Sequence, residues 1–134
     1  MAIDYGLKRT GVAVTDPLQI IASGLDMVPT SELMDFLKNY FSTELVEKVI
    51  VGEPLHKDGN PMEITQKVYG FVQQFKKLFP DKEVILQDER FTSKEASSII
   101  MQSGLKKKKR REKGLVDKIA AALILQEYME QNIW

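Results

Sequence analysis

The chain has 134 residues, 43% of them hydrophobic, with 19 Lys and Arg, 19 Asp and Glu, one His and no Cys. This length predicts a single domain over residues 1–134 that buries a core without disulfides or a structural metal. The absence of Cys excludes zinc fingers, iron–sulfur clusters and thiol nucleophiles, and a single His excludes a His-rich metal site. We expect a cytoplasmic protein with no membrane partner, because no apolar run reaches membrane length and Asp4, Lys8 and Arg9 interrupt any signal peptide.

The neutral net charge conceals an uneven distribution. Residues 106–113 hold seven of the 19 basic residues and one of the 19 acidic residues, so a segment of charge +6 adjoins a remainder of charge −6. Such a segment is typical of a contact with a polyanion, although a solvated loop that aids solubility explains it equally well. Its first six residues are Lys106, Lys107, Lys108, Lys109, Arg110 and Arg111.

The predicted elements alternate in type along the chain. In order, they are strands at 1–3, 11–15 and 20–28, a helix at 29–41, a strand at 46–51, a helix from 60 to 79, a strand at 83–86, and helices at 92–104 and 115–129. Asn60 as a cap and Pro61 at the first helical position predict where the second helix begins. The order predicts an α/β fold of the RNase H-like type, in which helices flank a mixed five-stranded sheet with an antiparallel three-stranded start.

Asp4 is the first candidate for chemistry. It ends the first predicted strand, and Gly6 follows it, so a phosphate could approach the backbone closely. Asp is also common in ordinary hairpins, where it accepts hydrogen bonds from the turn.

Asp88, Glu89 and Arg90 form the second candidate. They follow the apolar run 84–86, so they fall at the end of a predicted strand, where a sheet of this kind forms its ligand crevice. A charged loop in which Arg90 neutralises a neighbouring acid is the alternative.

Asp117 is the third candidate. It lies in the strongly apolar segment 115–125, near the start of the last predicted helix. The helix dipole favours a carboxylate there, and a metal ion would equally compensate a buried one. Carboxylates from two strand ends and this helix could converge to hold Mg²⁺ or Mn²⁺, and two such ions can drive the hydrolysis of a phosphodiester.

Four blocks of the sequence resemble the YqgF family of bacterial RNase H-like proteins. They are residues 2–16, 51–55, 88–93 and 116–126. The resemblance implies a cytoplasmic nuclease that processes the 5′ end of pre-16S rRNA in ribosome biogenesis, with pre-ribosomal particles as a further partner. An older description of the family implies a Holliday-junction resolvase, which would act on branched DNA and would need a homodimer, whereas an RNA nuclease could be a monomer.

The resemblance also assigns roles to residues. The acidic residues of the family map onto Asp4, the pair Asp88 and Glu89, and Asp117. We take Asp4, Glu89 and Asp117 as the catalytic metal ligands, with Asp88 in support. Phosphate contacts then fall to Lys8, Arg9 and Arg90, together with the six basic residues of the segment given above.

Two positions depart from the pattern of the family. The chain begins directly before its first motif, so we expect either a short first strand or a truncated start. Glu53 occupies a position that is more often apolar in relatives, and it could join the site as an extra ligand, although Gly52 and Pro54 indicate a structural turn. We expect His56 to be a surface residue and not a catalytic base.

Two other functions fit parts of the sequence. Asp4, Gly6 and Gly11 are similar to the phosphate loop of actin-like ATPases, but those enzymes close two domains around the nucleotide and this chain supplies one. A ribosome-assembly factor that binds RNA without cleaving it would need the basic segment and not Asp4.

Overall fold

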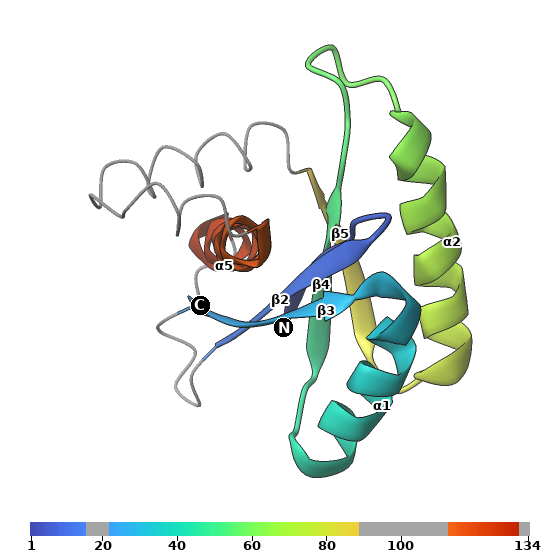
Figure 1. The fold of residues 1–134 in the computed structure, drawn as a ribbon, viewed down its shortest axis with the longest axis vertical. Coiled ribbons are helices and arrows are strands. Elements are labelled where there is room, and N and C mark those ends of the chain that lie inside the picture. Colours follow the sequence, from blue (N-terminus) through green and yellow to red (C-terminus); the bar gives the residue numbers. More distant parts are fainter. Residues whose placement is uncertain (16–21, 89–112, 132–134) are drawn as a thin grey trace.

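The computed structural model describes residues 1–15, 22–88 and 113–131, and the predicted helix at 92–104 lies outside these ranges. A five-stranded sheet forms the central layer (Figure 1). Helices α1 (Leu33–Thr43) and α2 (Glu63–Leu78) cover one side of the sheet, which we call the α1/α2 face. Helix α5 (Lys113–Gln131) covers the other side, the α5 face. This layering confirms the predicted α/β architecture.

The sheet has the strand order β3-β2-β1-β4-β5. Its strands are β1 (Ala2–Asp4), β2 (Arg9–Thr15), β3 (Ala22–Pro29), β4 (Lys48–Glu53) and β5 (Glu83–Asp88). β1 pairs antiparallel with β2, and β2 pairs antiparallel with β3. On its other side β1 runs parallel to β4, which in turn runs parallel to β5. The mixed sheet with an antiparallel start is therefore confirmed, and β1 is short, as expected.

The N-terminus holds β1 against its parallel neighbour. The Ile50 N–H donates to the Met1 carbonyl at 2.8 Å, and the α-amino group of Met1 donates to the Lys48 carbonyl at 3.1 Å. Burial lowers the pKa of this amino group to about 6. The hydrogen bonding of the central strand thus extends to the first residue.

The core on the α1/α2 face is large and rich in aromatic rings. Strand residues Ile3, Val12 and Val51 pack there against Leu37 of α1 and Phe75 of α2, all at most 1% exposed. The Phe75 ring contacts three other phenylalanine rings, with centroids 6.1 Å away for Phe41, 6.0 Å for Phe71 and 4.9 Å for Phe79. These buried rings explain the apolar stripes of α1 and α2.

The core on the α5 face is smaller and contains many alanines. Its buried members are Ala2, Ala13, Ile50, Ala121, Ile124, Leu125 and Met129. In α5, Leu123 is half-buried, whereas Ala121 and Leu125 are buried against the sheet. Small side chains on both layers allow α5 to pack closely on the sheet. No helix in the described ranges, α5 included, is both long and apolar enough to cross a membrane.

Helix α2 begins later than predicted. Its cap is Met62, whose N–H donates to the Thr65 hydroxyl at 2.8 Å, so the helix starts at Glu63. Asn60 instead donates its backbone and side-chain N–H groups to the Asp58 carboxylate, at 3.0 and 2.9 Å. The predicted cap at Asn60 is therefore wrong, because the preceding loop uses that residue to close a turn of its own.

Candidate functional site

Three acidic residues end β1, β4 and β5, the three neighbouring strands that pair in parallel. Asp4 is the last residue of β1, Glu53 of β4 and Asp88 of β5. Because these strands are parallel, their carboxyl ends lie at one edge of the sheet, where open α/β sheets bind their ligands. This edge is the candidate functional site.

The pleat of the sheet divides these acids between its two faces. Ala2 is buried in the α5-face cluster, so Asp4, two residues later, lies on the α5 face. Val51 is buried on the α1/α2 face, so Glu53 lies on that face, and its register partner Asp88 lies beside it. The strand ends thus bring Glu53 and Asp88 together, with Asp4 on the opposite face.

Glu53 has a partner on its own face. The Tyr69 hydroxyl of α2 donates to the Glu53 carboxylate at 2.5 Å. This hydrogen bond, followed by desolvation and the charge of Glu53, raises the pKa of Tyr69 above its ordinary value. The structure therefore ties Glu53 to α2 and does not bring it to Asp4 as an extra ligand.

The neighbours of Asp4 leave space on its face of the sheet. Asp4 is paired with Gly11 of β2, and continuing the pairing of Ile3 with Val51 sets it beside Gly52 of β4. Neither glycine has a side chain, so the two positions directly opposite Asp4 add none to its face of the sheet. Asp4 thus occupies a strand end with open backbone on both sides.

The turn between β1 and β2 is fixed by Thr30. The Thr30 hydroxyl donates to the Gly6 carbonyl at 2.6 Å, and the Thr30 N–H donates to the Lys8 carbonyl at 3.0 Å. The buried Thr10 hydroxyl lies 2.9 Å from the Thr30 hydroxyl. At Gly6, a Cβ atom would lie 2.2 Å from the Arg9 carbonyl oxygen, so the turn requires glycine there.

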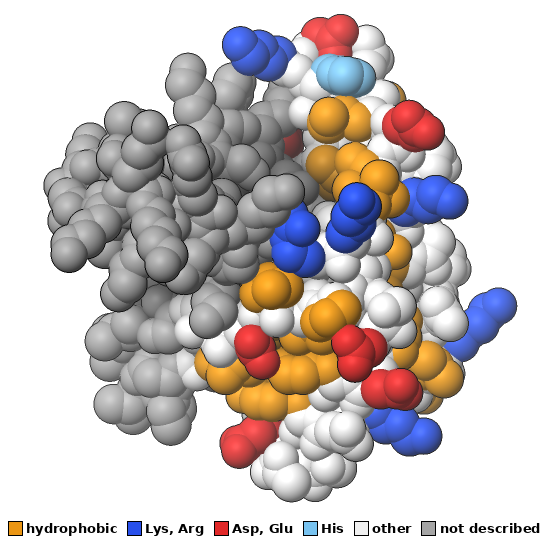
Figure 2. Space-filling model, viewed as in Figure 1, with side chains coloured by type: hydrophobic (Ala, Val, Ile, Leu, Met, Phe, Trp, Pro, Cys, Tyr) orange, Lys and Arg blue, Asp and Glu red, His pale blue; other side chains and the backbone are white. Residues whose placement is uncertain are grey.

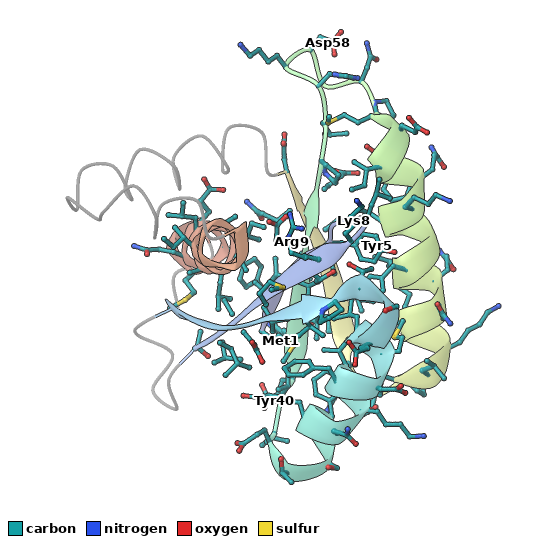
Figure 3. All side chains as sticks on the ribbon, viewed as in Figure 1. Met1, Tyr5, Lys8, Arg9, Tyr40 and Asp58 are labelled. Carbon is teal, nitrogen blue, oxygen red and sulfur yellow. The ribbon has the colours of Figure 1, made fainter. Side chains whose placement is uncertain are left out.

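Lys8 and Arg9 bring positive charge to this edge. Arg9 precedes Gly11 and Ala13 on β2 at even spacing, so it shares the α5 face with Asp4. Figure 3 shows Arg9 toward α5, and Lys8 and Tyr5 toward α2. In the same view, Figure 2 shows Lys and Arg side chains grouped at the centre of the described surface, beside hydrophobic ones. Of the two, Arg9 is the one that a phosphate next to Asp4 would meet, because it shares the α5 face with that carboxylate.

Several predicted site residues fall outside the described part of the structure. Glu89, Arg90 and the basic residues 106–111 lie outside it, and Asp117 is described only as a backbone position in α5. Within the described residues, no group of three or more His, Asp or Glu side chains could hold a metal ion. Of the three proposed metal ligands, Asp4 is the one whose side chain the structure describes.

His56 is exposed, as expected, in the loop between β4 and α2. Its N–H donates to the Asn60 carbonyl at 2.9 Å, and Gly59 adopts a φ of 89° in the turn. The hydrogen bonds from Asn60 lower the pKa of Asp58 in the same loop. This network is a self-contained turn and supplies no group to the Asp4 side of the sheet.

Sequence reasoning missed Tyr69 and Thr30. Tyr69 follows Thr65 by four residues on α2 and so shares a helix face with it, but only the register of β4 shows that Glu53 is within reach. Thr30 reads as the start of a helix, and its contact with Gly6 spans 24 residues of sequence. Pairings over such separations leave no local signal.

Known proteins match this sequence along nearly the whole chain. Residues 1–131 match the model of the RuvX family, described as "Holliday junction resolvase". A protein from Flavobacterium johnsoniae is 54% identical over 132 residues, which are 98% of this chain and 96% of the relative. A protein from Christiangramia forsetii is 52% identical over 129 residues, or 96% of each chain. Both relatives carry the name "Putative pre-16S rRNA nuclease".

Proposed function

The chain belongs to the RuvX family, also called YqgF, and on that premise we propose that it is a nuclease that cleaves phosphodiester bonds of pre-16S rRNA. The observation that carries this proposal is the placement of Asp4. It ends the central strand, and the positions opposite it on the two adjacent strands are glycines. It lies on the sheet face that α5 covers, with Arg9 on the same face. A carboxylate with open backbone and a nearby guanidinium suits a metal-bound phosphodiester.

The metal site that we propose consists of Asp4, Glu89 and Asp117, with Mg²⁺ or Mn²⁺ as the ion. Two features of the described residues support this set. In β5, Ile85 packs on the α5 face, so the odd-numbered residues of this strand belong to the face of Asp4, and Glu89 follows the strand in the sequence. Asp117 stands four and seven residues before Ala121 and Ile124, which are buried against the sheet.

Carboxylate oxygens are the ligands that these hard cations prefer, so the donor set fits the metal. Bound ions would activate water and stabilise the leaving oxygen of an in-line displacement. Asp88, which precedes Glu89 in the sequence, would support the metal site. Glu53 would hold the end of β4 against α2 through its hydrogen bond with Tyr69.

The remaining parts of the proposal concern the substrate and the setting. We propose that Lys8, Arg9, Arg90 and the basic residues 106–111 bind backbone phosphates. The protein would work in the cytoplasm on pre-ribosomal particles, as a single domain over residues 1–134 and as a monomer or homodimer. The description of the family favours one second candidate, cleavage of Holliday junctions, which would use the same carboxylates on branched DNA.

A cleavage assay with an Asp4→Asn variant tests the chemistry. The substrates are a labelled RNA that spans the 5′ end of 16S rRNA and a four-way DNA junction, each with Mg²⁺, with Mn²⁺ or with EDTA. Asp35→Asn, an exposed change of the same kind on α1, is the matched control. We expect Asp4→Asn to lower the rate at least about a hundredfold, because metal catalysis supplies several kcal/mol and each 1.36 kcal/mol is tenfold.

Four outcomes are informative, three from this assay and one from a binding measurement on the same RNA. Cleavage of the RNA that needs metal and Asp4 supports the proposed function. Cleavage of the junction alone favours the second candidate. Equal rates for the wild type and Asp4→Asn would reject the site, and RNA binding without any cleavage would identify an assembly factor.

A further inference from the structure

The turn over residues 5–9, which we call the β1–β2 turn, has an apolar tip. Leu7 is 67% exposed, between the tightly held Gly6 and the exposed Lys8. Single exposed apolar residues are common on protein surfaces, so exposure alone indicates nothing. Leu7 differs from such isolated residues because hydrogen bonds fix the backbone beside it and because it lies three residues from Asp4.

The β1–β2 turn is held from two sides. On one side, the Thr30 hydroxyl uses its proton on the Gly6 carbonyl, so the Thr10 hydroxyl is the donor in the contact of 2.9 Å between them. On the other side, the Tyr5 ring packs against Phe71 of α2, with centroids 5.2 Å apart. An exposed side chain on such a fixed turn loses little conformational freedom when it binds a ligand.

The charges around Leu7 indicate the chemistry of the partner. Lys8 follows it directly, and Arg9 lies one residue further on the face of Asp4. An apolar tip flanked by cations matches a nucleotide, which combines an apolar base with an anionic phosphate. In a duplex RNA the base faces are stacked on one another, so an apolar side chain packs on a base face only where the base is unpaired.

We propose that the β1–β2 turn is a preformed contact for single-stranded RNA, in which Leu7 packs on an unpaired base and Lys8 binds the adjacent phosphate. Thr30 is a positioning residue for this contact. The inference rests on the proposed function, because it places the unpaired nucleotide beside the bond that the strand-end site would cleave. It predicts that the site takes a single-stranded segment of the precursor and not a continuous duplex.

Binding measured without metal separates this proposal from cleavage. The full chain is titrated, in EDTA, into a fluorescently labelled single-stranded RNA and into a duplex of the same sequence. Leu7→Ala is compared with Leu45→Ala, a control at an equally apolar residue that is 89% exposed in the loop between α1 and β4. Both changes are at exposed positions, so neither removes a core contact.

We expect Leu7→Ala to weaken binding of the single strand about five- to tenfold, from the loss of buried apolar surface, and to leave duplex binding unchanged. The slope of log affinity against log salt should stay the same, whereas Lys8→Ala should reduce it by about one phosphate contact. Leu45→Ala should match the wild type. Equal effects of Leu7→Ala and Leu45→Ala, or equal losses for single strand and duplex, would overturn the proposal.

The role of Thr30 has its own test. Thr30→Val removes the hydroxyl but keeps the shape, and we expect it to weaken single-strand binding two- to fivefold with an unchanged salt slope, by loosening the turn. Thr30→Ser keeps the hydroxyl and should restore binding. If the Thr30→Val variant binds the single strand as tightly as the wild type does, Thr30 is not a positioning residue for this contact. If the wild type binds single strands through Leu7 but cleaves nothing, the proposed function fails and this inference stands.

Discussion

The two faces of the sheet are built from different residues. On the α1/α2 face, buried phenylalanine and β-branched side chains form a thick core, and α1 and α2 share the phenylalanine cluster. On the α5 face, alanines at positions 2, 13 and 121 bring a single helix close to the sheet. Because Asp4 and Arg9 lie on the α5 face, the thicker core supports the sheet while the thinner one places the charged groups of the site.

The contrast predicts that stability and catalysis respond to changes on opposite faces. A cavity on the α1/α2 face should cost folding free energy with little effect on the chemistry. A small displacement on the α5 face should change the relation of α5 to β1, which together contribute two of the proposed metal ligands. Variants at Phe75 and Ala121 test this separation, and a third prediction concerns the hydrogen bond that holds Glu53 on the α1/α2 face.

The largest expected effect on stability comes from Phe75→Ala. Phe75 is 1% exposed and contacts three other rings, so its removal leaves a cavity and should lower the free energy of unfolding by about 3–5 kcal/mol. Urea denaturation measures this change, and the rate of cleavage per folded molecule should be unchanged. Phe75→Leu, with a smaller loss of volume, should cost less and is available if the alanine variant does not fold. Loss of cleavage in a folded Phe75→Leu protein would contradict the separation of the faces.

An intermediate effect is expected from Ala121→Leu on the other face. Ala121 is fully buried, so the larger side chain overpacks the contact between α5 and the sheet and should cost about 1–3 kcal/mol. Displacement of α5 should also lower cleavage more than tenfold, since a shift of about 1 Å in a catalytic group can cost a hundredfold. The control is Val68→Ile, which overpacks the α1/α2 face at a fully buried position. Similar cleavage by the two variants would contradict the expected difference between the faces.

The smallest effect concerns the pair of Glu53 and Tyr69. The pKa of Tyr69 is raised because its hydroxyl donates to the Glu53 carboxylate, and Glu53→Gln should lower this pKa toward its ordinary value. Any stability that the pair adds is complete below the ordinary tyrosine pKa and is lost as the pH rises through the raised one. Ultraviolet titration of tyrosinate measures the shift, with Tyr69→Phe to assign the signal. An unchanged titration in Glu53→Gln would show that the hydrogen bond does not control Tyr69.

Much of this architecture is predictable because its signals are local. The apolar run at 49–51 and the helical spacing of Val68, Phe71 and Phe75 identify β4 and α2 directly. Asp4 is also accessible from the sequence, since a strand followed by Gly6 can be recognised within six residues. The order of strands and helices is sufficient to predict the mixed sheet.

The face of each acid could not be predicted in the same way. Whether Glu53 joins Asp4 depends on the pairing of Ile3 with Val51, since a shift of one residue in this register would exchange the faces. The prediction of Glu53 as an extra ligand was made without knowledge of this register. The role of Thr30 could not be predicted either, because it closes a turn that is 24 residues away in the sequence. The start of α2 was predicted too early because Asn60 forms hydrogen bonds within the preceding loop and does not cap the helix.

The position of α5 after all five strands in the sequence has a consequence for synthesis on the ribosome. A chain emerges from its N-terminus, and its strands up to Asp88 with α1 and α2 are complete before α5 is made. During that interval the α1/α2 face can close, while Ala2, Ala13 and Ile50 on the other face still await their helix. The nascent protein therefore passes through a stage in which the contacts of α5 with the sheet are absent, and in which Asp4 is present but the helix that carries Asp117 is not.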